Sequence, residues 1–191
     1  MRTFSLLFVA LALAAALAFS TGCGDTIGLT PAYIDNRVDT VSLYALSGTP
    51  VSAPSVYIIS YRQVARSDLS AVGFDFAFDI DTAGRPLILP TGALGLGRQS
   101  GIQKTLHQFD SVTVAPSGTY QGDSAVVVDS NQVLILHSRQ STCSDGRASV
   151  FYAKLHVLGI DTAAAKRSIK FEILNNINCG YRGLEPGLPK R

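Results

Sequence analysis

The sequence predicts an all-β protein, built as an antiparallel β-sandwich or a barrel-like single domain, and three observations support this class. Short apolar segments recur along the chain, turn residues separate them, and no segment keeps the period of about 3.6 residues that marks an amphipathic helix. The clearest segment, residues 72–81 (VGFDFAFDID), alternates apolar residues with mostly acidic ones, as a strand with one buried and one solvated face does. Many short strands joined by polar turns are typical of sandwiches and barrels.

We expect the domain to span residues 38–191 and to end in an irregular tail. Strands are expected at residues 38–46, 56–64, 72–81, 86–89, 104–114, 125–128, 133–138, 149–160 and 167–174. Glycine, proline, serine, asparagine or aspartate lies between successive strands, and these residues favour turns. The tail, residues 180–191, contains several glycines and prolines and has no strand pattern.

The N-terminal segment has the features of a secretory signal. Arg2 gives it a basic start, and residues 4–19 are almost wholly apolar but fall short of the ~20 residues that span a bilayer comfortably. We expect export by this signal. Cleavage after Ala16 or Ala18 by an ordinary signal peptidase is one alternative to lipoprotein processing, and an uncleaved membrane helix is another.

The stretch STGC, residues 20–23, resembles the lipobox of bacterial lipoproteins, although Ser20 stands where that family usually has leucine. The resemblance implies that residues 1–22 are removed as a signal peptide and that Cys23 becomes the lipidated first residue. Residues 23–37 would then tether the domain to a membrane, because they are rich in turn residues and have little periodicity. This predicts an extracytoplasmic, membrane-anchored lipoprotein of the periplasm or cell surface.

The charge balance gives no electrostatic case for binding nucleic acid. The chain has 16 basic and 14 acidic residues, and removal of Arg2 with the signal leaves 15 basic ones. Nucleic-acid-binding domains usually carry a clear positive excess, so we expect no such partner.

The two downstream cysteines, Cys143 and Cys179, are expected to form a disulfide. Export would place them in an oxidising compartment, where two cysteines are most often bridged. The bridge would close a loop of about 37 residues and contribute ~4 kcal/mol in the chain-entropy model. A metal pair and free thiols are the alternatives, but a zinc site needs four ligands at short spacings and the chain has no CxxC motif.

No motif of a common enzyme or nucleotide site is present in the sequence. The glycine-rich stretch 91–101 (TGALGLGRQSG) departs from the dinucleotide fingerprint and no βαβ unit surrounds it, so a surface loop is expected. Asp75, Asp79 and Asp81 could form a loose cation site, but a solvated strand face that ends in a turn is the simpler interpretation. There is no GxSxG, SxxK or HExxH pattern, so we expect a protein that is not an enzyme.

Three histidines, each in a predicted strand, are the candidate ligands for a cofactor. His107 alternates in phase with Phe109, and His137 alternates with the apolar residues of its strand, so both are expected to face inward. His156 alternates in phase with Lys154 and is expected to be exposed. Alternation does not show whether histidines from different strands converge.

Three motifs, over about residues 72–160, resemble those of the HmuY-type haem-binding lipoproteins in order and spacing. They are FDFAF at 74–78, FDSV at 109–112 followed by Ala115-Pro116 and Asp123, and FYAKL at 151–155. The lipobox agrees with this resemblance. Phe74 stands where the family usually has tryptophan, and the C-terminal stretch 178–184 (NCGYRGL) lies outside the family's pattern.

The resemblance implies an all-β, lipid-anchored envelope protein that holds haem iron between two axial side chains, which are histidines in some members and methionines in others. The only methionine of this chain is Met1, within the signal. Haem, the possible cofactor, would therefore need two of His107, His137 and His156 as its ligands.

The leading hypothesis is a non-enzymatic, lipid-anchored binding protein of the bacterial envelope, with haem or a similar small ligand as the sharpest candidate. The alternative is a structural or protein-partner lipoprotein without a small ligand, with the surface around Tyr181 and Arg182 near the disulfide as the place to look. A hydrolase is the third hypothesis. Two histidines that face each other across an apolar pocket would favour haem, whereas a carboxylate or Ser/His cluster in a cleft would favour a hydrolase.

Overall fold

The computed structural model describes residues 30–66 and 73–190 of the chain. The predicted signal peptide, Cys23 and the first part of the predicted tether lie outside these described residues. The described strands all belong to one compact unit, Pro31–Arg191. Within the described part of the chain, no helix is long and apolar enough to cross a membrane.

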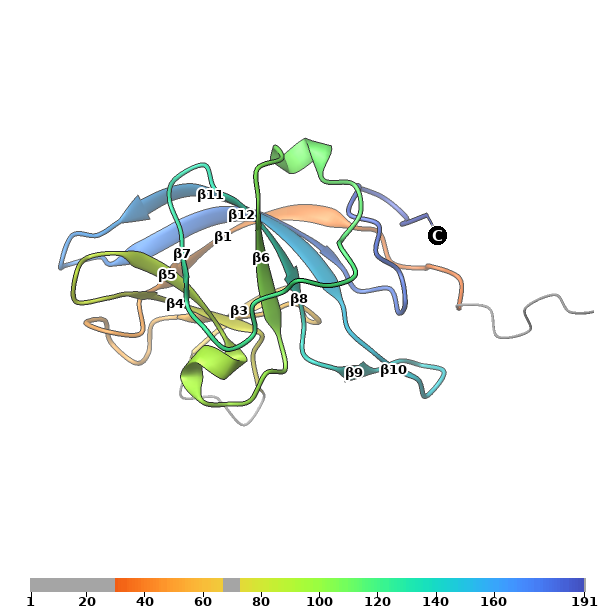
Figure 1. Cartoon of the computed structure of the whole chain (residues 1–191), viewed down its shortest axis with the longest axis horizontal. Helices are drawn as coiled ribbons and strands as arrows, with labels where there is room; N and C mark the ends of the chain where they lie inside the picture. The colour runs from red at the N-terminus through yellow and green to blue at the C-terminus, as the bar shows by residue number, and fades with distance from the viewer. Residues whose placement is uncertain (1–29, 67–72, 191) are drawn as a thin grey trace, which may run out of the picture. The chain divides into compact units, whose positions relative to one another are not determined.

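Antiparallel strands form two five-stranded sheets that pack as a sandwich (Figure 1), so the predicted all-β, single-domain class is confirmed. The first sheet contains, in spatial order, β1 (Arg37–Tyr44), β12 (Ser168–Asn176), β11 (Tyr152–Asp161), β8 (Val133–His137) and β6 (Gly101–Thr105). The second contains β3 (Gln63–Ala65), β2 (Val56–Ile58), β4 (Phe76–Ile80), β5 (Pro86–Pro90) and β7 (Val126–Val127). The remaining elements are the hairpin of β9 (Ser141–Thr142) and β10 (Ala148–Ser149) and the short 3-10 helices η3 (Thr91–Leu94) and η4 (Phe109–Ser111).

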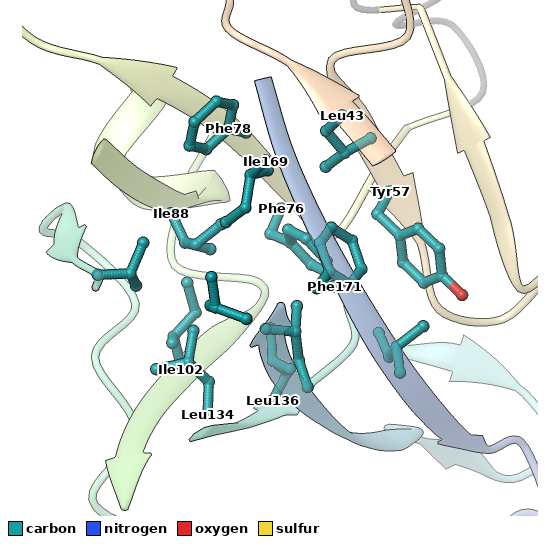
Figure 2. Packing of buried hydrophobic residues seen from close by; sticks show 14 of the residues in the cluster. Leu43, Tyr57, Phe76, Phe78, Ile88, Ile102, Leu134, Leu136, Ile169 and Phe171 are labelled. Carbon is teal, nitrogen blue, oxygen red and sulfur yellow. The ribbon is translucent and has the colours of Figure 1, made fainter. Parts of the chain in front are cut away.

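The central core lies between the two sheets, where alternate residues of each strand point inward (Figure 2). On β12, Ile169, Phe171 and Ile173 are fully buried in it. The rings of Tyr57 and Phe76 stack with their centroids 5.3 Å apart, and the Phe171 ring lies 6.1 Å from that of Phe76. Because aromatic side chains bury large areas, these three rings supply a large part of the apolar burial that holds the sheets together.

The strand expected at residues 72–81 is shorter than predicted, and its acidic face is not simply solvated. β4 begins only at Phe76, after a bend, and Phe74 packs in a separate apolar cluster on the other face of the second sheet. Asp75, expected to face solvent, is 2% exposed and accepts a hydrogen bond from the Ile59 N–H at 2.7 Å. The bend therefore reverses the roles that simple alternation assigns to residues 74 and 75.

Most other predicted strands are present with small shifts, but two predicted strands and one predicted loop are wrong. Residues 56–64 form two strands, β2 and β3, joined by a tight turn in which Arg62 has a φ of 53°. Residues 104–114 do not form one strand, because β6 ends at Thr105 and the chain then turns into η4. The stretch 91–101, expected to be a loop, contains η3 and the first residue of β6.

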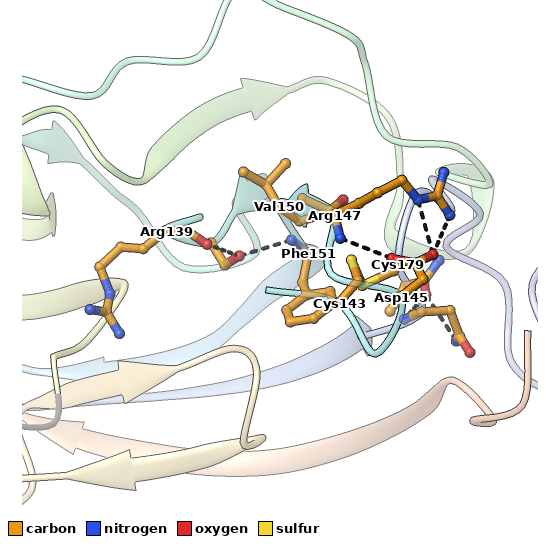
Figure 3. Close-up of a disulfide and its surroundings, with 11 residues drawn as sticks. Arg139, Cys143, Asp145, Arg147, Val150, Phe151 and Cys179 are labelled. Atoms are coloured by element: carbon orange, nitrogen blue, oxygen red, sulfur yellow. Dashed lines mark hydrogen bonds and ion pairs between the residues drawn. A yellow bond between two sulfur atoms is a disulfide. The ribbon is translucent and has the colours of Figure 1, made fainter. Parts of the chain in front are cut away.

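Cys143 and Cys179 form the predicted disulfide, with their Cα atoms 6.0 Å apart (Figure 3). The bridge joins the turn between β9 and β10 to the segment that follows β12. Beyond Cys179 the tail is irregular, as expected. The disulfide therefore fixes the start of a segment that has no strand of its own.

The domain begins a few residues before position 38, within the predicted tether. The Tyr33 N–H donates to Asn178 Oδ1 at 3.0 Å, and the Asn36 N–H donates to the Gly187 carbonyl at 2.8 Å. The chain before β1 and the C-terminal tail are thus hydrogen-bonded to each other.

Candidate functional site

The outer face of the first sheet, opposite the central core, is covered by two irregular segments. One is residues 106–121, which follow β6, and the other is the tail, residues 177–190; we call them together the outer cover. Backbone hydrogen bonds join them, from the Ala115 N–H to the Arg182 carbonyl at 2.8 Å and from the Leu184 N–H to the Thr113 carbonyl at 2.7 Å. Beneath them lies an apolar cluster of Phe109, Val112, Ala115, Val133, Ile135, Leu174 and Leu184.

Lys154 of β11 points into this outer face and attaches the cover to the sheet. Its side chain is buried, and Nζ donates to the Phe109 carbonyl at 2.8 Å and to the Val112 carbonyl at 3.0 Å. Nζ also lies 4.5 Å from the centre of the Phe109 ring, within the range of a cation–π contact. Burial lowers the pKa of Lys154, while nearby carboxylates, Asp110 first, oppose that shift. The two carbonyls bracket η4, so this one ammonium group holds the turn against β11.

A groove of about 560 Å³ lies beside η4 on the same outer face, and we call it the His156 groove. Its walls come from residues 105–110 and residues 130–132, and Val133, His156 and Glu172 line it between them. These three residues are neighbours in the register of β8, β11 and β12, so the sheet itself positions them. Most of the lining side chains are polar, in contrast to the central core.

The pair of His156 and Glu172 is the most organised polar feature of this groove. Glu172 Oε1 lies 2.7 Å from His156 Nδ1, and the two side chains are 29% and 24% exposed, respectively. In a neutral imidazole bonded in this way Nδ1 carries the proton, so Nε2 is left as the basic nitrogen, able to bind a metal or accept a proton. The ring of Phe109 lies 6.1 Å from the imidazole and limits its movement on one side.

The three candidate histidines do not converge on one point. His107 is exposed in the turn after β6 rather than inward in a strand, and it lines the rim of the His156 groove. His156 is half-buried rather than exposed, because its face of β11 is covered and Lys154 beside it is buried. His137 lies at the other end of β8, four residues from Val133, which is ~13 Å along a strand. The structure thus brings His107 and His156 to one groove and leaves His137 apart.

His137 has its own contacts and lies on the outer face, not in the central core. Its ring meets that of Tyr120 edge to face, with centroids 4.8 Å apart, and its Nδ1 lies 2.9 Å from the Ser138 carbonyl. These contacts give His137 a structural role that does not depend on a ligand.

The surface expected around Tyr181 and Arg182 is not free for a partner. Tyr181 is only 5% exposed, and its hydroxyl accepts a hydrogen bond from the Ala32 N–H at 3.2 Å. Arg182 donates through Nε to the Ala115 carbonyl at 2.7 Å. Both side chains therefore fasten the tail.

The acidic residues of the 72–81 segment do not form a cation site. Asp75 is buried, Asp79 accepts hydrogen bonds from Ser47, and Asp81 caps the turn before Arg85. Among the described residues, no group of three or more histidines, cysteines or carboxylates is placed to hold a metal ion.

The sequence reasoning missed Glu172 and Lys154 as parts of the site. Both alternate with apolar residues that face the central core, and such alternation is the usual sign of a solvated outer face. The signal that was available is the apolar pair Phe109 and Val112, which needs a surface to cover and lies directly after β6.

No model of a protein family matches the chain, and no curated protein matches it.

Proposed function

We propose that this protein is a non-enzymatic, lipid-anchored binding protein of the bacterial envelope that holds haem or a similar small ligand in the His156 groove. The observation that carries the proposal is the His156–Glu172 pair within a groove that His107 also lines. A carboxylate bonded to one ring nitrogen orients the imidazole and increases the basicity of the other, as at many metal-ligating histidines. The volume of about 560 Å³ lies in the range of about 300–1,000 Å³ found for small-molecule sites.

The groove is mostly polar and is not the apolar pocket expected of a haem site, so a ligand here would be bound chiefly through iron and would remain partly open to solvent. His156 would supply one nitrogen ligand to the iron, and His107, exposed in its turn at the rim, would supply another. Leu106 is fully exposed beside His107 and offers an apolar contact for a planar ring. Asp110 and Glu172 make the groove acidic, so the carboxylates of haem would have to face solvent.

The lipobox and the disulfide support the proposed location. Disulfides persist mainly in oxidising compartments, and Cys143–Cys179 agrees with export. Cys23 is the proposed attachment point for lipid and therefore for the membrane. Labelling with a radioactive fatty acid should mark the wild-type chain and not Cys23→Ser, and equal labelling of both would reject the anchor.

A haemin titration tests the proposed ligand. Because the described core belongs to the compact unit Pro31–Arg191, the chain can be produced from Gly24 onward without signal and lipid. We expect a sharpened, shifted Soret band that saturates at one equivalent. His156→Ala should abolish it, His107→Ala should weaken it, and His137→Ala is the matched control that should leave it unchanged.

Glu172→Gln tests the role of the carboxylate without removing the ligand. Loss of an outer partner of a metal-bound histidine typically weakens affinity by about 10–100-fold, so a fall of about tenfold is expected. A spectrum equal to that of free haemin, or an equal loss in His137→Ala, would reject the haem proposal. The alternative, a structural or protein-partner lipoprotein, would then be favoured, with a partner surface away from the buried Tyr181.

A further inference from the structure

A second cavity shares no lining residue with the His156 groove, and it contains an arginine whose two terminal nitrogens are not hydrogen-bonded to the described residues. The cavity has a volume of about 300 Å³, and Gly73, Phe74, Thr91, Leu96, Gln99 and Arg139 line it. Arg139 follows the end of β8, and its side chain extends away from the disulfide (Figure 3). This side chain is 28% exposed.

The backbone and Asp75 together hold the Arg139 side chain in place. Asp75 Oδ1 accepts the Arg139 backbone N–H at 2.8 Å and lies 3.4 Å from Nε, while Oδ2 accepts the Ile59 N–H at 2.7 Å. Gly73, with a φ of 66°, permits the guanidinium to lie against the main chain, because a Cβ there would collide with Nη1. These contacts therefore orient the two terminal nitrogens, Nη1 and Nη2, without accepting a hydrogen bond from either of them.

Apart from the contact of Nε with Asp75, the guanidinium donors make no hydrogen bond to the described residues. Nε is buried and ion-paired with Asp75 Oδ1 at 3.4 Å but makes no hydrogen bond of good geometry, and the hydrogen bonds of the described residues include none from Nη1 or Nη2. Two other side-chain donors of the cavity are already paired. Thr91 Oγ1 donates to the Gly97 carbonyl at 2.8 Å, and Gln99 Nε2 donates to the Leu96 carbonyl at 3.0 Å. Because the Arg139 side chain is 28% exposed, its Nη donors are open to the cavity and can donate to an acceptor that a ligand brings.

We propose that this cavity binds a carboxylate carried by a small apolar body, with Arg139 as its recognition residue. Arginine presents parallel N–H groups that match the two oxygens of a carboxylate. Asp75 already offers Arg139 one negative charge, so a monoanion is favoured over a dianion such as phosphate. Phe74 and Leu96 supply apolar walls for the rest of the ligand.

Calorimetric titration of the chain from Gly24 onward with benzoate, in 150 mM sodium chloride, tests this site. Benzoate should bind saturably at one equivalent, and benzamide, which has the same shape without the charge, should bind at least tenfold more weakly. Arg139→Gln should weaken benzoate binding at least tenfold. Arg98→Gln is the matched control, because Arg98 is a nearby exposed arginine that pairs with Asp123 at 3.2 Å, and it should leave binding unchanged.

Arg139→Lys keeps the positive charge beside buried Asp75 and removes the fork, so it serves if the glutamine variant does not fold. We expect it to fold and to weaken benzoate at least fivefold. Absence of saturable benzoate binding, equal affinity for benzamide, tighter binding of inorganic phosphate, or an equal loss in Arg98→Gln would each overturn the proposal. His156→Ala should have no effect on benzoate, so the failure of this site and that of the haem site are separate results.

Discussion

The two faces of the first sheet bury their side chains in different ways. The inner face packs apolar side chains such as Leu155 and Phe171 against the second sheet, and both are fully buried. The outer face lies under the irregular outer cover and contains Lys154 and the His156–Glu172 pair. Burial of apolar groups needs only shape and area, whereas burial of polar groups is costly without specific partners. The His156 groove and the hydrogen-bonding side chains therefore both lie on the outer face, beneath the irregular outer cover.

The largest expected loss of stability comes from the inner face, where Phe171→Ala removes the ring that contacts both Tyr57 and Phe76. Truncation of a buried phenylalanine usually costs about 3–5 kcal/mol, so we expect a loss of about 4 kcal/mol in the free energy of unfolding. Urea denaturation followed by circular dichroism measures it. A loss below about 1 kcal/mol would mean that the inner face is not the main source of stability.

Removal of the disulfide should have the next largest effect on the free energy of unfolding, because the disulfide fastens the start of the tail that forms part of the outer cover. Replacement of Cys143 and Cys179 together by serine should lower the free energy of unfolding by roughly 3 kcal/mol. Comparing urea unfolding of the wild-type chain with and without a reducing agent gives an independent measure. If reduction has no effect, the tail is held by its hydrogen bonds alone.

The substitution Lys154→Met tests the stability of the outer face independently of the inner face. Methionine fills a similar volume but leaves the Phe109 and Val112 carbonyls without their donor, which should cost about 1–3 kcal/mol. Amide hydrogen exchange should accelerate in residues 106–116 and stay unchanged in β12. Lys104→Met, at an exposed position of β6, is the matched control. Uniform acceleration in both segments would contradict a local role for Lys154.

The smallest effect is expected from Tyr57→Phe in the central core. Asn175 Nδ2 donates to the Tyr57 hydroxyl at 2.9 Å, and loss of this bond should cost about 1 kcal/mol at pH 7. Burial raises the pKa of Tyr57 to about 12, so the folded form keeps its proton in a range where the unfolded form, with a pKa of 10.0, loses it. Stability should therefore fall as the pH rises from 10 to 12 in the wild-type chain. Unfolding curves at both pH values should show a smaller fall in the phenylalanine variant.

The fold class could be predicted from the sequence because alternation reports directly which residues face a core. β11 and β12 fall close to their expected positions, and the disulfide pairing follows from the two cysteines that remain after Cys23. The same rule fails for Lys154 and His156, because it assumes that only one face of the sheet is covered. It also fails at Asp75, where a bend ahead of β4 turns an apparently solvated carboxylate into the interior.

The candidate site could be predicted only in part, since its components come from separate segments. The three histidines were found as candidates, but strand register, not spacing along the chain, places His156 beside Glu172. The haem ligands remain a proposal. Arg139 carries no sequence signal at all, because its orientation depends on Gly73 and Asp75, which precede it by more than sixty residues.

The covalent loop closed by Cys143 and Cys179 determines how proteolytic cleavage of the chain can be detected. The loop contains all of β11 and β12 and the exposed turn between them, which includes Lys166 with its side chain 72% exposed. A trypsin-like protease that cuts after Lys166 would leave two polypeptides that stay joined through sulfur. On a non-reducing gel the nicked protein would migrate near the intact one, and only reduction would release the fragments.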